Sequence, residues 1–311
     1  MGVHDLHIRK FTWKNIVSQK QLIFMSLPLV IYLIVFTYVP LWGWTMAFQN
    51  YKPGKSFDQQ TWVGLKWFEY LFSDEQFLRV LRNTIVTSLI NLVLGFVTAI
   101  GLALLLNEVK NMFLKRMVQT ISYLPHFLSM VIVAGIVMNG LSTEDSLLND
   151  VLVKIGIVQE PVVWLGVGEY FWGIIGGANV WKEVGWNTII YLAAIASIDP
   201  TLYEAASVDG ANRYQKMWHI TLPGLRPTFV ILLILSIGNI LNAGFELQFL
   251  LKNGLNQDYS QTIDVYVVVF GYQSGNYSMA TAAGMFKTIV SVILIFLANG
   301  FAKRIGEERL I

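Results

Sequence analysis

The sequence lacks cysteine altogether and is poor in charged residues. Without a cysteine, the chain can hold no disulfide framework, no cysteine-ligated iron–sulfur cluster and no thiol nucleophile. Only 14% of its 311 residues are charged, whereas a soluble globular domain carries about 25%. Hydrophobic residues make up 55%, so the chain cannot cover itself in water, which predicts a membrane protein. The net charge of +2 is too small to indicate a nucleic-acid partner.

Residue patterns that would support catalysis by this chain are also missing. Residues 284–288 (GMFKT) resemble the end of a phosphate-binding loop only faintly, because the Gly-Lys pair is absent. The four histidines, His4, His7, His126 and His219, show no metal-ligand spacing. We therefore predict that the chain is not an enzyme and binds no cofactor or metal. If ATP drives its action, a separate subunit must hydrolyse it.

Six apolar stretches are each long enough to cross a bilayer, for which about 20 residues suffice. They are Leu22–Phe48, Phe77–Leu106, Val118–Leu141, Tyr170–Ser197, Pro227–Leu251 and Tyr277–Ala302. This pattern predicts an all-α polytopic membrane protein with six transmembrane helices. Pro28 and Pro40 could kink the first helix, and Pro125 could break the start of the third.

The basic residues indicate an orientation. Thirteen lysines and arginines lie in the N-terminal segment, in residues 107–117, in residues 204–227 and in the C-terminal tail, against seven assigned to the opposite side of the membrane. This excess predicts that both termini face the cytoplasm. The basic start resembles a signal peptide, but the apolar run that follows exceeds the usual ~7–15 residues and has no small-residue cleavage site. We therefore expect a retained first helix.

No shift in composition marks a domain boundary. We expect a single transmembrane domain over residues 1–311, with a basic cytoplasmic leader (1–21), a peripheral first helix (22–48) and a core of about 77–302. Three outer loops are longer than simple turns: 49–76, 142–169 and 252–276. They could form a lid, contact an extracytoplasmic partner or be ordinary solvated connections.

A stretch of small and polar residues, 204–227, interrupts the apolar pattern. Just before it, Asp199 is a suitable N-cap and Pro200 a suitable first residue for a helix that would end at Asp209. Gly210 can then adopt the left-handed conformation that ends a helix. A chain that only recrosses a membrane needs a short loop, so this compact, well-terminated segment predicts a docking element.

A second short helix is predicted directly after this glycine. Asn212 can cap it, and Gln215, three positions later, can complete a capping box. Pro223 is expected to stop this helix, because proline lacks the backbone N–H that continues one. The two helices would form a hairpin at the membrane surface.

The same stretch carries a longer pattern, made of Glu204, Ala205, Ala206, Asp209, Gly210, Ala211 and Pro223. In this spacing these residues resemble the EAA loop of ABC importer permeases. From about Arg82 onward, the chain is similar to the permease subunits of binding-protein-dependent sugar importers. Residues 276–284 (NYSMATAAG) and 303–308 (KRIGEE) resemble the branch that handles plant polysaccharides or other complex oligosaccharides.

The resemblance implies a five-helix importer core, a peripheral first helix and a cytoplasmic coupling helix in a bacterial cytoplasmic membrane. It also implies partners: a second, homologous permease, most often a different one, and two ATPase subunits that hold Mg-ATP. An extracytoplasmic solute-binding protein would deliver an oligosaccharide, and membrane lipid would surround the helices. By resemblance, Glu204 would contact the ATPase groove and Gly210 would allow the turn.

Polar residues recur within two predicted spans. Asn179, Glu183 and Asn187 are spaced four apart in the fourth span, which places them on one helix face. The spacing of Asn239, Asn242 and Glu246 in the fifth span predicts a second polar face, and we expect Asn242 and Glu246 to contact substrate. Because a charge at the bilayer centre costs at least ~2.5–3.5 kcal/mol, such faces meet protein or water rather than lipid. They could line a path for a sugar, or they could bond one another between helices.

Two other kinds of membrane protein fit part of this pattern. A secondary transporter of a polar solute could use Glu183 and Glu246 as coupling-ion carboxylates at mid-membrane, but the 204–227 stretch would then have no purpose. A membrane scaffold without a path would tolerate leucine at the polar faces. Co-purification of an ATPase would distinguish an ABC importer permease from a secondary transporter.

Overall fold

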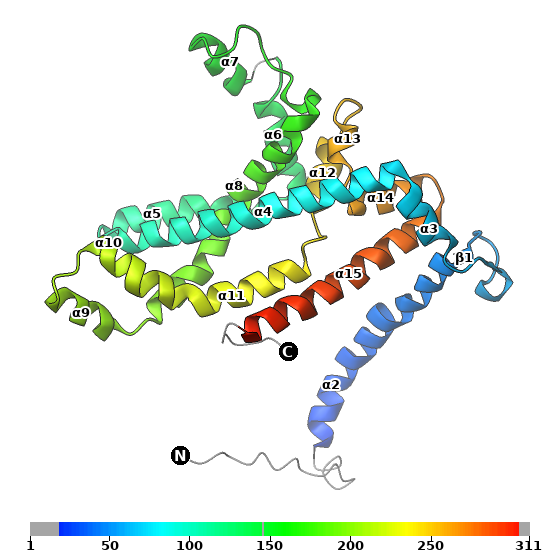
Figure 1. Ribbon diagram of the computed structural model, residues 1–311, viewed down its shortest axis with the longest axis horizontal. Helices are drawn as coiled ribbons and strands as arrows, with labels where there is room; N and C mark the ends of the chain where they lie inside the picture. The colour runs from blue at the N-terminus through cyan, green and yellow to red at the C-terminus, as the bar shows by residue number, and fades with distance from the viewer. Residues whose placement is uncertain (1–18, 145, 305–311) are drawn as a thin grey trace.

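The computed structural model describes residues 19–144 and 146–304, and almost all of its regular structure is helical (Figure 1). Within these ranges, the only strands are β1 (Gln49–Asn50) and β2 (Thr61–Trp62), which form one antiparallel pair. Most of the predicted leader (1–21) and of the basic tail lies outside the described residues. The predicted all-α class is confirmed.

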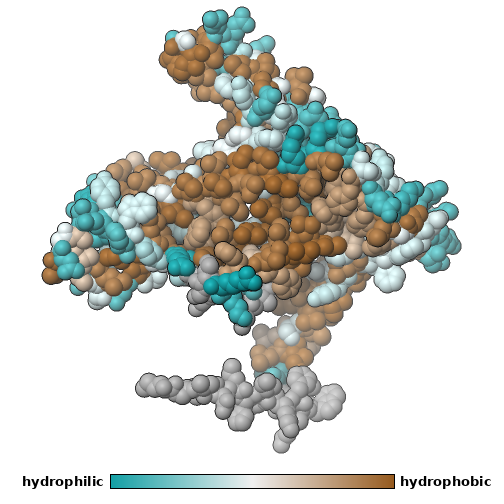
Figure 2. Space-filling model, viewed as in Figure 1, coloured by the Kyte–Doolittle hydropathy of each residue, from teal (hydrophilic) through white to brown (hydrophobic). Residues whose placement is uncertain are grey.

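In the described part of the chain, four helices are long and apolar enough to cross a membrane without a break. They are Lys20–Phe48, α4 (Glu75–Glu108), Arg213–Gly238 and α15 (Tyr277–Arg304). Two further apolar segments are bent pairs, so the count reaches six if each pair is one span. Figure 2 shows the apolar belt that these helices present, with polar residues gathered toward the ends of the molecule.

The first span stands apart from the other helices in Figure 1. Its first segment, α2 (Lys20–Leu33), contains Pro28 and has no buried residue. A π turn, η1 (Ile34–Tyr38), precedes η2 (Val39–Phe48), which begins with Pro40 near its first position. Among the described residues, η2 packs against the rest of the bundle, where it contacts α15 and α3 (Lys66–Ser73). The outward face of α2 is therefore available to lipid or to another chain.

The third predicted span, Val118–Leu141, is not one straight helix. The chain runs through α5 (Met112–Tyr123) and a 3₁₀ turn, η4 (Leu124–Phe127), and then turns by 104° into α6 (Met130–Gly140). Pro125 lies at the start of η4, and Ser129 caps α6 by accepting a hydrogen bond from the Ile132 N–H. The expected break is present, but it falls in the middle of the segment rather than at its start.

The predicted bounds of the fifth span, Pro227–Leu251, are wrong at both ends. The helix begins at Arg213 and runs through α10 (Arg213–Lys216), a π turn, η6 (Met217–Thr221), and α11 (Leu222–Gly238). Residues 239–245 are irregular, and the chain resumes as α12 (Glu246–Leu251), α13 (Gln257–Ser260) and α14 (Ile263–Val268). The apolar run continues past Gly238, so hydropathy alone could not place this end.

The centre of the bundle is the pairing of α4 with α8 (Gly168–Ala196). Tyr191 and Ile195 of α8 are buried against Ala99 and Ala103 of α4 and Leu225 of α11. On the other side of the molecule, α14 and α15 are joined by an ion pair between Lys287 and Asp264. A paired charge is tolerated in a membrane where a single one is not, which accounts for the lysine inside the sixth span.

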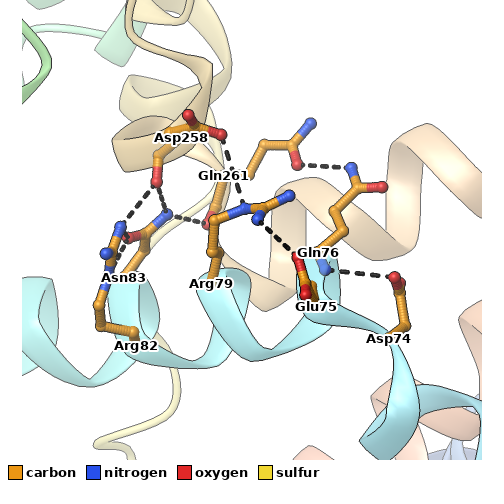
Figure 3. Close-up of polar contacts among 8 residues, drawn as sticks. All are labelled: Asp74, Glu75, Gln76, Arg79, Arg82, Asn83, Asp258 and Gln261. Carbon is orange, nitrogen blue, oxygen red and sulfur yellow. Dashed lines mark hydrogen bonds and ion pairs between the residues drawn. The ribbon is translucent and has the colours of Figure 1, made fainter.

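A polar lattice joins the start of α4 to α13 (Figure 3), at the end of the molecule away from residues 204–227 (Figure 1). Asn83 is fully buried, and its side-chain amide donates to the backbone carbonyls of Asp258, at 2.9 Å, and Gln261, at 3.0 Å. The Arg82 guanidinium donates to the same Asp258 carbonyl and lies over the rings of Trp172 and Tyr259. The loop that follows the fifth span is therefore fixed on the bundle.

Candidate functional site

The first candidate site is the polar hairpin, which is built as the sequence predicts at its beginning. Asp199 caps α9 (Pro200–Val208), and its carboxylate accepts a hydrogen bond of 2.9 Å from the Thr201 N–H. This backbone hydrogen bond holds the pKa of Asp199 below its usual value. Asp209 is the C-cap and Gly210 has φ = +79°, a conformation that favours glycine.

The second helix begins as predicted and ends much later. Asn212 and Gln215 form the full capping box, with the Asn212 N–H donating to the Gln215 side chain at 2.8 Å and the reverse bond at 3.0 Å. Pro223 does not stop this helix. It lies at the start of α11, directly after the π turn η6. The wider π turn shifts the pairing of the backbone hydrogen bonds, so that no N–H is required from residue 223.

The hairpin projects from one end of the bundle, and α9 is its outer helix (Figure 1). α9 leaves α8 at 67°. Side-chain bonds tie it to the following helix: Tyr203 and Thr221 share a hydroxyl–hydroxyl bond of 3.0 Å, and Lys216 donates to the Ser207 hydroxyl at 2.6 Å. Glu204 is exposed, and Val208 is 88% exposed. The hairpin is thus a braced unit with an uncovered outer face.

We expect Asn212→Ala to loosen this hairpin locally. The substitution removes an N-cap acceptor, which is worth about 0.5–2 kcal/mol. Amide hydrogen exchange over residues 213–216 should accelerate by about three- to thirtyfold, measured by mass spectrometry. Gln215→Glu preserves the reciprocal acceptor of the capping box and should exchange like the parent. Unchanged exchange in Asn212→Ala would show that the cap does not stabilise the hairpin.

The second candidate site is a cavity of about 280 Å³ between α4, α8 and the irregular segment after α11. Asn179, Glu183 and Asn187 line it together, so the predicted shared face of the fourth span is present. Asn242 lines the same cavity from residues 239–245. The Asn179 side chain donates to that of Asn91 on α4 at 3.2 Å, and Asn91 also lines a neighbouring cavity of about 170 Å³.

The predicted second polar face does not exist as a helix face. The helix ends at Gly238, so Asn239 and Asn242 lie in the irregular segment and Glu246 begins a separate helix, α12. Asn239 supports the cavity indirectly, because its side-chain oxygen accepts a hydrogen bond of 3.0 Å from the Asn242 amide. Glu246 is exposed and does not line the cavity.

Comparison with known proteins identifies the chain. The sequence model of one family, described as the binding-protein-dependent transport system inner membrane component, matches residues 91–307, well over half of the chain. The chain belongs to this family. It is therefore the permease subunit of an ABC importer, a membrane component rather than an enzyme. The secondary transporter and the pathless scaffold are set aside.

The permease is similar to several known proteins. It is 45% identical over 300 residues to the polygalacturonan/rhamnogalacturonan transport system permease protein YteP of Bacillus subtilis (strain 168), covering 96% of this chain and 93% of that protein. Protein LplB of the same organism is 41% identical, over 94% and 91% of the two chains. A crystal structure of a bacterial ABC transporter involved in the import of the acidic polysaccharide alginate contains a chain with a TM-score of 0.88 and 41% identity, covering 94% of this chain and 98% of that one.

Two residues of the permease beside the cavity have partners that the sequence pattern does not predict. His126, at the break of the third span, holds the Glu183 carboxylate at 2.8 Å, and Lys182 donates to the His126 carbonyl at 2.6 Å. The adjacent Lys182-Glu183 pair inside an apolar span was the available signal. No local pattern predicts the contact of His126, because its partner Glu183 lies 57 positions away in the sequence.

Proposed function

We propose that this permease and a second, homologous permease together form the pathway for importing an oligosaccharide derived from an acidic polysaccharide. An extracytoplasmic solute-binding protein delivers the saccharide, and two copies of a separate ATPase supply energy from Mg-ATP. The observation that carries this proposal is α9: a braced, capped and exposed helix beyond the end of α8, in which no residue is buried by the described part of the chain.

The substrate class is supported by the relatives and by the cavity. Two of the relatives named above belong to transport systems for acidic polysaccharides: polygalacturonan/rhamnogalacturonan in one case and alginate in the other. A second crystal structure, with a TM-score of 0.87 and 41% identity, contains the alginate transporter with an alginate pentasaccharide-bound periplasmic protein. The cavity of the permease offers side-chain amides from Asn91, Asn179, Asn187 and Asn242. Amides both donate to and accept from hydroxyl groups, and they tolerate carboxylates.

Energy coupling is assigned to the hairpin. Glu204, Ala205, Ala206, Asp209, Gly210, Ala211 and Pro223 are the residues proposed to couple it to the ATPase. With α9 seated in a cleft of the ATPase, closure of the ATPases on ATP moves the hairpin as a rigid body and rocks α8 and α11, between which it is anchored. ATP shifts the equilibrium because it binds the two states with different affinity.

The proposed orientation places the hairpin and both termini in the cytoplasm. The start of α2 and the end of α15 both lie away from α3 (Lys66–Ser73) and the β1–β2 pair (Figure 1). Arg213 and Lys216 lie in the hairpin, and Lys303 and Arg304 end α15. Basic residues concentrate on the cytoplasmic side of bacterial membrane proteins.

ATPase stimulation of the purified complex tests this function. The complex of both permeases and the ATPases in lipid nanodiscs is mixed with the solute-binding protein and a panel of neutral and acidic oligosaccharides. We expect the acidic oligosaccharides to raise the ATPase rate above that of the unloaded binding protein. Stimulation by neutral sugars alone would overturn the substrate class, and a complex that lacks ATPase activity would overturn the importer assignment.

The double substitution Asn179→Leu with Asn242→Leu should impair uptake through the cavity. Each lost amide removes hydrogen bonds worth about 1 kcal/mol, so saccharide uptake should fall about ten- to a hundredfold. Basal ATPase activity should persist, because the hairpin is untouched. Glu246→Gln, outside the cavity, is the control and should transport normally. Normal uptake in the double variant would exclude the cavity as part of the path.

A further inference from the structure

A second cavity, of about 440 Å³, lies at the base of the hairpin between the ends of three helices. Asn107 at the end of α4, Lys115 of α5 and Ala196 at the end of α8 line it. Pro200 and Tyr203 of α9 form the wall on the hairpin side. The volume is many times the space that one water molecule needs. The cavity therefore has room for a group of the size of a phosphate ester.

This cavity lies at the level where the apolar spans end on the hairpin side. The apolar run of α4 ends at Leu106, directly before Asn107. The apolar run of α8 ends at Ser197, between the lining residues Ala196 and Ile198. With the hairpin in the cytoplasm, as proposed above, the cavity is at the headgroup level of the inner leaflet.

The charge of the cavity is positive and uncompensated. Among the described residues that line it, Lys115 alone is charged, and Lys115 is half-buried. Its ammonium has no ion-pair partner within residues 19–144 and 146–304. Lys110 and Arg116 lie in the same short connection, against one acid, Glu108. Because burying an unpaired charge costs free energy, an anion that enters the cavity is stabilised.

The remaining lining residues suit the two ends of a lipid headgroup. Gln119 lies one turn after Lys115 on the same face of α5. The side-chain amides of Gln119 and Asn107 can donate to phosphate and accept from hydroxyl groups. Leu192 and Ile195 line the cavity about one turn deeper along α8, where the glycerol backbone and the first methylene groups of a lipid would lie. Basic pockets between transmembrane helices on the cytoplasmic side bind anionic headgroups in other membrane proteins.

We propose that this cavity binds the headgroup of an anionic phospholipid of the inner leaflet, with the phosphate on the Lys115 ammonium. The bound headgroup contacts the hairpin through Pro200 and Tyr203 as well as α5 and α8. Tyr203 is itself bonded to Thr221, at the far end of the hairpin. The lipid thus ties the hairpin to the bundle and makes energy coupling depend on anionic lipid. This inference rests on the cytoplasmic orientation of the hairpin given under the proposed function.

Native mass spectrometry of the complete complex, both permeases with the ATPases, tests the site directly. The complex in detergent is titrated with phosphatidylglycerol or with phosphatidylcholine of the same acyl chains. We expect Lys115→Gln to raise the dissociation constant of phosphatidylglycerol about five- to tenfold, the range of one lost lysine contact. Lys115→Arg should bind like the parent. Lys110→Gln removes an equal charge from an exposed position outside the cavity, and it should also bind like the parent.

Nanodiscs made with and without phosphatidylglycerol test the effect on coupling. Phosphatidylglycerol should raise the stimulation of ATPase activity by the loaded solute-binding protein several-fold in the parent and in Lys110→Gln. Lys115→Gln should not respond to the lipid. Equal stimulation of the parent in both kinds of nanodisc would overturn the dependence of coupling on anionic lipid.

The alternative outcomes are separable. Parent-like lipid binding by Lys115→Gln, or equal weakening in Lys110→Gln, would overturn the site while leaving the importer assignment intact. Displacement of phosphatidylglycerol by millimolar inorganic phosphate or glycerol 3-phosphate would overturn the lipid as occupant and assign the cavity to a soluble phosphate. If Lys115→Gln does not assemble, Lys115→Met keeps the length of the side chain and decides the same comparison. A complex without ATPase activity would overturn the proposed function, and mass spectrometry would still decide the lipid site.

Discussion

Exchanging Glu204 for lysine is expected to abolish saccharide uptake while leaving the permease inserted in the membrane. Glu204 is exposed on α9 and forms no ion pair among the described residues, so its reversal disturbs little within the chain. When α9 is docked on the ATPase, the lysine would face a site that is complementary to the Glu204 carboxylate. Bringing like charges together in an interface costs several kcal/mol. Uptake assays and co-purification of the ATPase measure the two consequences, and both signals should be lost.

Gly210→Pro tests the same coupling through the backbone. Proline requires φ near −65°, whereas Gly210 has φ = +79° and donates its N–H to the Ser207 carbonyl at 3.2 Å. The turn between the two short helices cannot form in this variant. Glu160→Lys, an equal charge reversal at an exposed position in the loop before α8, controls for charge alone and should keep the ATPase bound. Normal uptake in either hairpin variant would contradict the docking role.

Gly185→Ala is expected to damage the core of the permease. A Cβ at this position of α8 would overlap the carbonyl group of Ser122 and lie 2.9 Å from the backbone nitrogen of Tyr123. These are backbone atoms of α5, which cannot rotate away as a side chain can. Separating the helices would also strain the contacts of Lys182 and Glu183 with His126. We expect a loss of about 1–3 kcal/mol or more in the free energy of unfolding.

Thermal unfolding of the detergent-purified permease checks this expectation. Gly177→Ala is the matched control, because it lies on the same helix and a Cβ there has no neighbour within 4 Å. Replacing a helical glycine by alanine with no clash stabilises by about 1 kcal/mol, so the two variants should shift the melting temperature in opposite directions. Equal melting temperatures would show that α5 moves freely against α8.

The hairpin was predictable because its determinants are local. Asp199, Asn212 and Gln215 bond to backbone groups two or three residues away, and Gly210 ends a helix by its own conformational freedom. The prediction that Pro223 ends the second helix was wrong, because a π turn accommodates the missing backbone N–H and the helix continues. The sequence shows the proline but not the accommodating turn.

The polar groups of the fourth span were also predictable as a face, since helical spacing alone aligns Asn179, Glu183 and Asn187. Their partners were not predictable. Asn91 and Asn242 reach the same cavity from segments 88 and 63 residues from Asn179. The prediction that Asn242 and Glu246 share a helix face was wrong, because the helix ends at Gly238, eight residues before Glu246.

The sequence by itself determined the membrane class, five of the six spans in outline, and the capped hairpin, because hydropathy and capping act over neighbouring residues. The tertiary structure alone decided where the fifth span ends, how sharply the third span turns, and that His126 and Lys182 meet Glu183 there. A break within a span is stable only if its freed backbone groups find partners, and in this permease that partner, Lys182, comes from another helix. Helix ends inside a membrane therefore depend on contacts that no local pattern records.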